Sequence, residues 1–233
     1  MISAVILAGG LGTRLRSVVP DLPKPMAPIN GRPFLEWQLD YWIRQGVEHF
    51  IISAGYRHDV ITGHFGSTYK SVRIDYVIEE TPLGTGGGVL LAAQALADDR
   101  SFLLLNGDTY FAVDLRTLMD FSSKNDADCC FSLFRTRESG RYMAVNILPE
   151  GKLSELSAEA FTPEFLANGG IYWMRSSIFN GSFSAGDKVS LEADIFPAAM
   201  SAGKRLYGLE CAGTFIDIGV PDDYKRASDL LVP

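Results

Sequence analysis

The sequence predicts an α/β protein with a Rossmann-like, doubly wound sheet, mixed but mostly parallel, in one domain over residues 1–233. Three observations predict this fold. Short apolar runs typical of buried strands alternate with helical stretches in the first half of the chain. Glycine-rich turns follow several of these runs, where open α/β sheets bind ligands. A chain of 233 residues, 47% hydrophobic, also fits one domain with a substantial core.

The first half of the chain supplies the regular alternation. Pro33 and Gly46 bracket one helical stretch, because proline starts helices and glycine ends them. The residues of 73–79 alternate, and those of 101–106 are almost continuously apolar, as in strands. We expect strands at 3–7, 50–54, 73–79 and 101–106, and helices at 33–45, 59–65 and 86–97.

After about residue 114 the alternation loosens. A Pro-Glu-Gly turn at 149–151 separates two strand-like runs, and Gly203 ends a helical stretch. We expect helices at 118–123, 191–202 and 221–231, and strands at 127–134, 142–148, 170–174, 205–209 and 215–218. The second half, from about residue 114 to 233, is therefore expected to build on the same sheet as the first.

Composition excludes several classes of partner. The formal net charge of −7 and the isoelectric point near 5.0 argue against nucleic acid. No apolar run approaches the roughly 18 residues of a membrane span, so we expect no membrane contact and a cytoplasmic protein. The sequence leaves a homo-oligomer open. Trp37 and Trp42 fit an interface, although core positions on their helix are favoured about two to one.

The stretch after the first strand predicts a phosphate site. Gly9, Gly10 and Gly12 allow a loop whose N–H groups bind an anion. Arg14 adds a guanidinium suited to phosphate oxygens, and the prolines around Lys24 are expected to hold it in an extended, stiff segment. Neither a Walker A run nor a dinucleotide Gly-x-Gly-x-x-Gly is present, so the pattern favours a nucleoside triphosphate.

A second glycine-rich stretch, 79–88, follows a predicted strand and opens a helix. Its small residues leave room for a flat base. A carboxylate at Glu79 or Glu80 accepts from both N1–H and the exocyclic amine of guanine, whereas uracil and thymine offer one donor on that edge. This favours guanine modestly. The alternative is a glycine turn beside a solvated acidic pair.

Asp108 follows a buried strand and a glycine, a place where a carboxylate can hold a divalent cation. Mg²⁺ prefers one or two carboxylates together with phosphate oxygens. The alternative is that Asp108 caps the turn with Thr109.

Several motifs together resemble those of the sugar-1-phosphate nucleotidylyltransferases, also called sugar-nucleotide pyrophosphorylases. The signature is carried by Gly9-Gly10-Leu11-Gly12-Thr13-Arg14-Leu15 with Pro23-Lys24-Pro25-Met26. Leu-Gly-Thr-Gly-Gly at 83–87, Asn-Gly-Asp at 106–108, Asn-Gly-Gly-Ile-Tyr at 168–172 and Phe-Ile-Asp-Ile-Gly-Val-Pro at 215–221 resemble later family motifs. The last departs from Trp-x-Asp-x-Gly-Thr-Pro at Phe215 and Val220.

The resemblance implies the nucleotide-diphospho-sugar transferase fold, with a nucleotide-binding half at about 1–113 and a sugar-phosphate-binding half at about 114–233. It implies catalytic roles for Arg14 and Lys24, and Mg²⁺ held by Asp108 and Asp217. The residues expected to bind the nucleotide are Leu7, Ala8, Gly9, Gly10, Gly12, Thr13, Glu79, Glu80, Pro82, Gly84, Thr85, Asn106 and Gly107.

The sugar-phosphate site is less complete. Asn168, Gly169 and Gly170 are expected to bind sugar hydroxyls, but the lysine of the family's Glu-Lys-Pro is missing. The cations available to replace it are Arg141, Lys152, Arg175 and Lys188, and of these Arg141 and Lys188 are placed at the site. Ser190 to Glu192 fits either this site or a helix N-cap with a core leucine, at about even odds.

The implied reaction is in-line transfer of a nucleotidyl group from a nucleoside triphosphate, GTP before others, to a sugar 1-phosphate. The chain most resembles the bacterial guanylyltransferases for D-glycero-D-manno-heptose 1-phosphate, which supply GDP-heptose for surface polysaccharide such as lipopolysaccharide or S-layer glycan. The alternatives are mannose-1-phosphate guanylyltransferase, N-acetylmuramate-1-phosphate uridylyltransferase and a non-catalytic regulatory subunit that binds nucleotide sugar.

Overall fold

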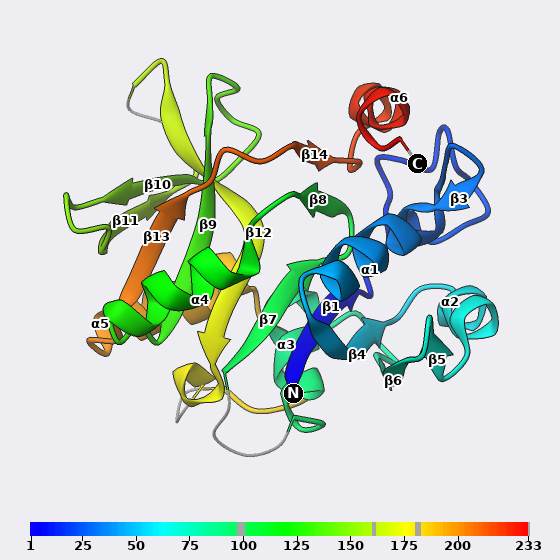
Figure 1. Cartoon of the computed structure of the whole chain (residues 1–233), viewed down its shortest axis with the longest axis horizontal. Coiled ribbons are helices and arrows are strands. Elements are labelled where there is room, and N and C mark those ends of the chain that lie inside the picture. Colours follow the sequence, from blue (N-terminus) through cyan, green and yellow to red (C-terminus); the bar gives the residue numbers. More distant parts are fainter. Residues whose placement is uncertain (97–100, 160–161, 180–182, 233) are drawn as a thin grey trace.

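The computed structural model describes residues 1–96, 101–159, 162–179 and 183–232. Its centre is a ten-stranded mixed sheet in the order β11-β10-β12-β7-β1-β4-β6-β5, with β9 pairing with β12 and β13 pairing with β9 (Figure 1). The predicted fold class is confirmed, and strands of both halves of the chain join in one sheet.

Four strands of the first half are parallel and adjacent in the sheet. They are β1 (Ile2–Ala8), β4 (Val47–Ala54), β6 (Val72–Ile78) and β7 (Ser101–Asn106), and β1 lies between β4 and β7. Alternate side chains of β1 enter separate clusters, Ala4 and Ile6 on one face and Val5 on the other. A strand buried on both faces needs a continuous apolar run, which explains the sequence pattern.

Helices cover both faces of the sheet. On one face pack α1 (Phe34–Arg44), α2 (His58–Phe65) and α4 (Leu115–Lys124), and on the other α3 (Gly84–Ala93) and α5 (Phe196–Ser201). The closing helix α6 (Pro221–Leu230) packs in a third cluster with the loop after β1, through Ala227, Leu15 and Val19. Trp37 and Trp42 are 8% and 2% exposed, so the core interpretation of α1 is confirmed.

The second half is mostly antiparallel. Its long strand β12 (Phe165–Arg175) pairs antiparallel with β7 and with β9 (Cys129–Thr136), and β13 (Leu206–Glu210) runs parallel to β9. The outer strands are β10 (Ala144–Ile147) and β11 (Leu153–Ser157). In Figure 1 the strands β9 to β13 lie on the left side of the molecule, and α6 lies at the upper right.

Short elements complete the chain. They are the 3-10 turns η1 (Lys24–Met26) and η2 (Ser176–Phe179), the π turn η3 (Leu191–Ile195), the pairs β2 (Pro28–Ile29) with β3 (Arg32–Pro33) and β8 (Thr109–Phe111) with β14 (Phe215–Asp217), and β5 (Thr68–Tyr69) beside β6.

Four local expectations differ from the structure, one in conformation and three in bounds or helix type. Lys24 begins a helical turn instead of lying in an extended segment, because Met26 N–H and Ala27 N–H bond back to the carbonyls of Pro23 and Lys24. The helix expected at 86–97 starts two residues earlier and ends at Ala93, and residue 97 lies outside the described residues. The helix expected at 191–202 is split into η3 and α5. The strand expected at 170–174 is the end of the longer β12.

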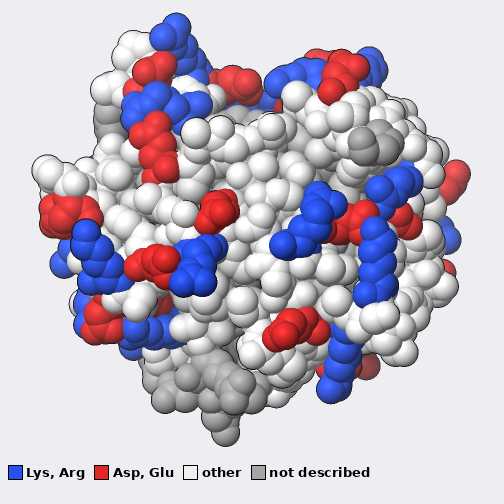
Figure 2. Space-filling view, viewed as in Figure 1, with Lys and Arg blue, Asp and Glu red and all other residues white. Residues whose placement is uncertain are grey.

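The surface matches the composition. On the face shown in Figure 2, Lys and Arg are interspersed with Asp and Glu, which gives no continuous basic track on that face. None of the described helices is both long and apolar enough to traverse a lipid bilayer.

Candidate active site

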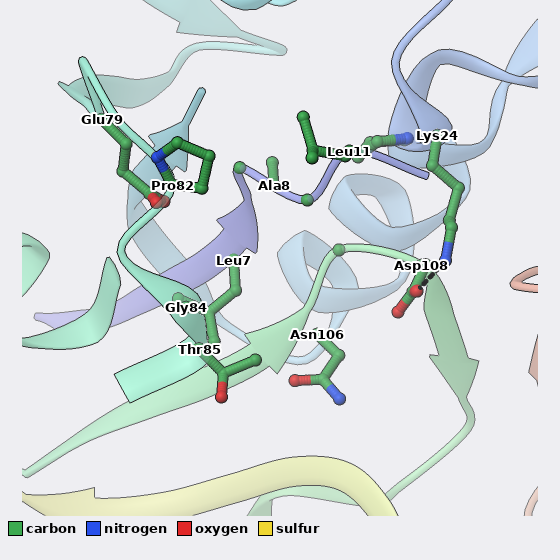
Figure 3. A pocket seen from close by; sticks show the side chains of 14 residues that line it. Leu7, Ala8, Leu11, Lys24, Glu79, Pro82, Gly84, Thr85, Asn106 and Asp108 are labelled. Atoms are coloured by element: carbon green, nitrogen blue, oxygen red, sulfur yellow. Dashed lines mark hydrogen bonds and ion pairs between the residues drawn. The ribbon is translucent and has the colours of Figure 1, made fainter. Parts of the chain in front are cut away.

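A cavity of about 280 Å³ lies at the carboxyl ends of β1 and β7 (Figure 3). Parallel strands end at the same edge of a sheet, so the turns that follow them meet there. The residues that line the cavity are Leu7, Ala8, Gly9, Gly10, Leu11, Lys24, Pro25, Glu79, Pro82, Gly84, Thr85, Asn106, Gly107 and Asp108. All but Leu11 and Pro25 were expected. Both of those stand inside the motifs, which is the signal that could have found them.

Two glycines are required by close contacts. A Cβ on Gly9 would lie 2.2 Å from Oε1 of Glu79, and a Cβ on Gly107 would lie 2.5 Å from the carbonyl oxygen of Leu7. A side chain at position 107 would push the ends of β1 and β7 apart, and one at position 9 would displace the carboxylate of Glu79. The glycine pattern in the sequence therefore reflects how closely the strand ends approach one another.

Glu79 lies at one end of the cavity and is held there by two hydrogen bonds. Its Oε1 accepts from Ser53 Oγ at 2.9 Å, and its Oε2 accepts from Leu83 N–H at 3.2 Å. Glu80 is exposed and lines only a neighbouring cavity of about 590 Å³, which Glu79 also borders. Of the two carboxylates expected at the base site, Glu79 is the one placed in the main cavity.

The start of α3 is locked to the segment before η3. Gly86 and Gly87 donate their N–H groups to the carbonyl of Val189, while Thr85 Oγ1 donates to Glu192 Oε2 at 2.8 Å. Ser190 Oγ accepts from the N–H groups of Glu192 and Ala193, and Leu191 is fully buried. Ser190 is thus an N-cap beside a core leucine, and Glu192 helps to fix one wall of the cavity.

A cationic and acidic cluster lies at the other end of the cavity. Lys24 Nζ contacts Asp108 Oδ2 at 2.5 Å, as the dashed line in Figure 3 marks, with side chains 12% and 30% exposed. The pairing of β8 with β14 brings Asp217 beside Thr109, one residue from Asp108. Burial and the neighbouring Asp108 charge raise the pKa of Asp217 to about 6, against the opposing effect of a 2.6 Å hydrogen bond from Gly219 N–H.

These carboxylates suit a divalent metal ion. Their oxygens are the ligand type that hard cations prefer, and Mg²⁺ often takes only one or two carboxylates and completes its shell with phosphate oxygens and water. Among the described residues no group of three or more His, Cys, Asp or Glu side chains could hold a metal. Asp108 and Asp217 would therefore hold the ion together with oxygens of the substrate.

Besides Glu80, two expected nucleotide-binding residues, Gly12 and Thr13, lie outside this cavity, and so does Arg14, which was expected to be catalytic. Gly12, Thr13 and Arg14 follow the lining residues Gly10 and Leu11, and the side chain of Arg14 is exposed. Gly12 has a φ of +59°, a conformation that favours glycine, and its Cα faces Lys24. Arg14 is therefore exposed to solvent outside the cavity.

The Asn168–Gly170 segment contacts the end of β7 directly. A Cβ on Gly170, whose φ is +70°, would lie 2.7 Å from Nδ2 of Asn106. The amide of Asn168 donates to Tyr172 Oη at 2.6 Å and accepts from Gly170 N–H at 3.1 Å. The side chain of Asn168 therefore orders its own strand, while the glycines allow the close approach to β7.

The four candidate cations differ in position. Arg141 forms ion pairs with Asp223, which is 3% exposed, and with Glu138. Arg175 lies beside Ser101, at the opposite end of β7 from Asn106, and pairs with Asp126.

The other two cations are lysines. Lys152 forms an isolated antiparallel β-bridge, through its backbone, with Tyr207 of β13. Lys188 is exposed on the segment that contacts the start of α3. Neither Arg141 nor Lys188 lines the main cavity.

Known proteins are similar to this chain over nearly its whole length. The model of the nucleotidyl transferase family matches residues 3–232. The D-glycero-alpha-D-manno-heptose 1-phosphate guanylyltransferase of Aneurinibacillus thermoaerophilus is 40% identical over 228 residues, covering 98% of this chain and 97% of that protein. The protein of the same name from Campylobacter jejuni is 38% identical over 223 residues, covering 95% and 96%.

Solved structures give the same result. The crystal structure of HddC from Yersinia pseudotuberculosis superposes with a TM-score of 0.85 at 33% identity, covering 99% of both chains, and HddC has also been crystallised with GMP-PN. With the glycine loop, the Lys24–Asp108 pair and the mixed sheet in place, the chain belongs to the nucleotidyl transferase family.

Proposed function

We propose that this chain transfers GMP from GTP to D-glycero-α-D-manno-heptose 1-phosphate and releases pyrophosphate, as a cytoplasmic enzyme that supplies GDP-heptose for surface polysaccharide. The observation that carries the reaction class is one cavity with a glycine loop, the fixed Glu79 at one end and Lys24 paired with Asp108 at the other. The choice of heptose and guanine is supported by the names of the two full-length relatives.

In this proposal the chain acts by positioning and charge neutralisation. The attacking sugar phosphate is already an anion, so no general base is required. Lys24 binds the α-phosphate and the incoming sugar phosphate, and Arg14 closes over the β- and γ-phosphates from the solvent side. Enzymes of the family generally use a divalent metal. The ion, in our proposal Mg²⁺ on Asp108 and Asp217, supplies electrostatic stabilisation of charge on the phosphate oxygens.

The base lies in the nucleotide-binding half, about 1–113, against the backbone of Ala8 and Gly9. Glu79 accepts from N1–H and the amine of guanine. Its two oxygens each accept one bond within the protein, and a carboxylate oxygen has capacity for a second. Because Ser53 and Leu83 hold this carboxylate in place, it does not have to be ordered when the nucleotide binds.

The sugar phosphate lies in the second half, about 114–233. Gly170 brings the backbone of β12 next to Asn106, and sugar hydroxyls bind there to Asn168, Gly169 and Gly170. Arg141 and Lys188 supply the cation that other members take from Glu-Lys-Pro. Arg141 is supported by its ion pair with Asp223 of α6, the helix that follows the β14 segment carrying Asp217.

Pyrophosphate release tests the proposal. GTP, CTP, UTP, ATP and dTTP are each combined with the 1-phosphates of heptose, mannose, glucose and N-acetylmuramate, with Mg²⁺ present. Release with GTP and heptose phosphate alone is the expected result. Release with UTP or dTTP instead of GTP would contradict the recognition of guanine by Glu79 but would still support the nucleotidyl transfer reaction. Nucleotide binding without release from any pair would favour a regulatory subunit.

A further inference from the structure

A fully buried amide lies beneath the turn that carries Asp108. Gln38 stands on α1 and is 0% exposed. Its Nε2 donates to the carbonyl of Asn106 at 2.8 Å and, by a shorter contact, to the carbonyl of Thr109. These two carbonyls bracket Gly107 and Asp108, so one side chain joins the two ends of the turn.

Backbone contacts hold the rest of the turn. Gly107 N–H donates to the carbonyl of Leu7 at 2.9 Å, and Ile218 N–H donates to the carbonyl of Asp108 at 3.0 Å. The first contact ties the turn to β1 and the second ties it to the segment after β14. Gln38 adds a tie to α1, and the three contacts approach the turn from different elements.

Space filling alone does not account for this amide. Its Oε1 is buried and has no hydrogen-bond partner among the described residues. A buried acceptor without a partner destabilises a fold, so filling this space alone would favour an apolar side chain, but an apolar side chain would leave the carbonyls of Asn106 and Thr109 without the donor that Nε2 supplies. The neighbouring Trp37 and Leu39 on α1 are themselves core residues. What the amide provides is the donation from Nε2 to the turn.

We propose that Gln38 is a positioning residue that holds the Asp108 carboxylate where it binds the metal ion together with Asp217. The inference rests on the proposed function, in which Asp108 is a metal ligand. Groups that orient metal ligands typically change metal affinity 10- to 100-fold when they are removed. Gln38 touches neither nucleotide nor sugar phosphate, so its loss weakens metal binding much more than it lowers turnover at saturating metal.

Gln38→Met tests the inference, because methionine fills a similar space and cannot donate. The matched control is Gln45→Met. Gln45 lies at the end of the same helix and also bonds backbone through its side chain, accepting from Leu115 N–H at 3.2 Å, away from Asp108. Two quantities are measured, the Kd for Mn²⁺ by calorimetry with a non-hydrolysable GTP analogue and the Mg²⁺ dependence of pyrophosphate release.

Gln38→Met is expected to raise the Mn²⁺ Kd and the half-saturating Mg²⁺ concentration about tenfold, with kcat at saturating Mg²⁺ changed much less. Gln45→Met is expected to leave the metal constants unchanged. Circular dichroism checks that each variant is folded, and Gln38→Asn, whose amide is one methylene shorter, serves if the methionine variant does not fold.

The outcomes separate this inference from the proposed function. If Gln38→Met and Gln45→Met gave the same Mn²⁺ Kd while the wild-type protein bound metal and released pyrophosphate, only the role of Gln38 would be overturned. If the wild-type protein did neither, the proposed function would fall, and the inference with it.

Discussion

The two halves of the molecule prepare their parts of the site in different ways. In the first half, the lining residues stand in short consecutive segments after parallel strands, and glycines allow the strand ends to meet. In the second half, the candidate residues come from antiparallel elements far apart in the chain, and Arg141 is paired with the buried Asp223. In a parallel sheet the carboxyl ends of all strands lie at the same edge, so the residues that follow them are brought together by the topology itself. In an antiparallel sheet the strand ends alternate, so site residues are brought together by individual side-chain contacts.

The largest effect in the first half of the chain is expected for Lys24→Ala. We expect kcat for pyrophosphate release to fall about 10³-fold, because the ammonium group neutralises charge on both reacting phosphates. The melting temperature is expected to stay close to the wild-type value, since the side chain ends in the cavity and not in the core. A kcat within a few fold of wild type would contradict the role of Lys24.

Arg141→Ala tests the site residues of the second half of the chain. We expect KM for the sugar phosphate to rise about 10- to 100-fold with KM for GTP nearly unchanged, since the charge-assisted contact is lost on one substrate only. Arg175→Ala is the control, because Arg175 lies at the far end of β7. Equal effects of both variants on either KM would show that Arg141 acts through stability.

Glu79→Gln tests the base end of the cavity. An amide cannot accept through both of its terminal atoms, so we expect the preference of kcat/KM for GTP over other triphosphates to fall about tenfold. Glu80→Gln, which alters the neighbouring exposed carboxylate, is the control and is expected to change the preference little. A preference unchanged in Glu79→Gln would place base recognition elsewhere.

The smallest expected effect concerns acid stability. Burial alone would raise the pKa of Asp40 on α1, but hydrogen bonds from Lys70 and Arg32 outweigh it and lower the pKa below its usual 3.8. The stability that Asp40 contributes is thus full above about pH 4 and is lost as pH falls through its lower folded-state pKa.

Urea unfolding at about pH 3 and about pH 6 measures this contribution. We expect Asp40→Asn to reduce the pH dependence of the unfolding free energy by on the order of 1 kcal/mol. The comparison in the second half is Asp126, an exposed partner of Arg175 and Arg205. Asp126→Asn is expected to reduce the pH dependence of the unfolding free energy by less than Asp40→Asn does. An equal reduction in both variants would contradict this difference between the two halves.

The sequence was most informative where structure is local. The parallel strands and the glycine turns follow from apolar runs and from the demands of close backbone approach, and so does most of the cavity lining. The pairing of β8 with β14 joins segments about a hundred residues apart, and no local pattern encodes it. Ser53 and Gln38 were not predicted as site residues, because a polar side chain within a strand or a helix acquires its distant partner only in the folded chain.

Gly170 abuts Asn106 because β12 and β7 are neighbours in one sheet. The places proposed for the two substrates are thus joined by a shared row of strand hydrogen bonds, without a hinge. We expect this arrangement to have an evolutionary consequence. Loops of the second half can be exchanged to accept new sugars while the distance between the two phosphates, set by the sheet itself, is inherited unchanged.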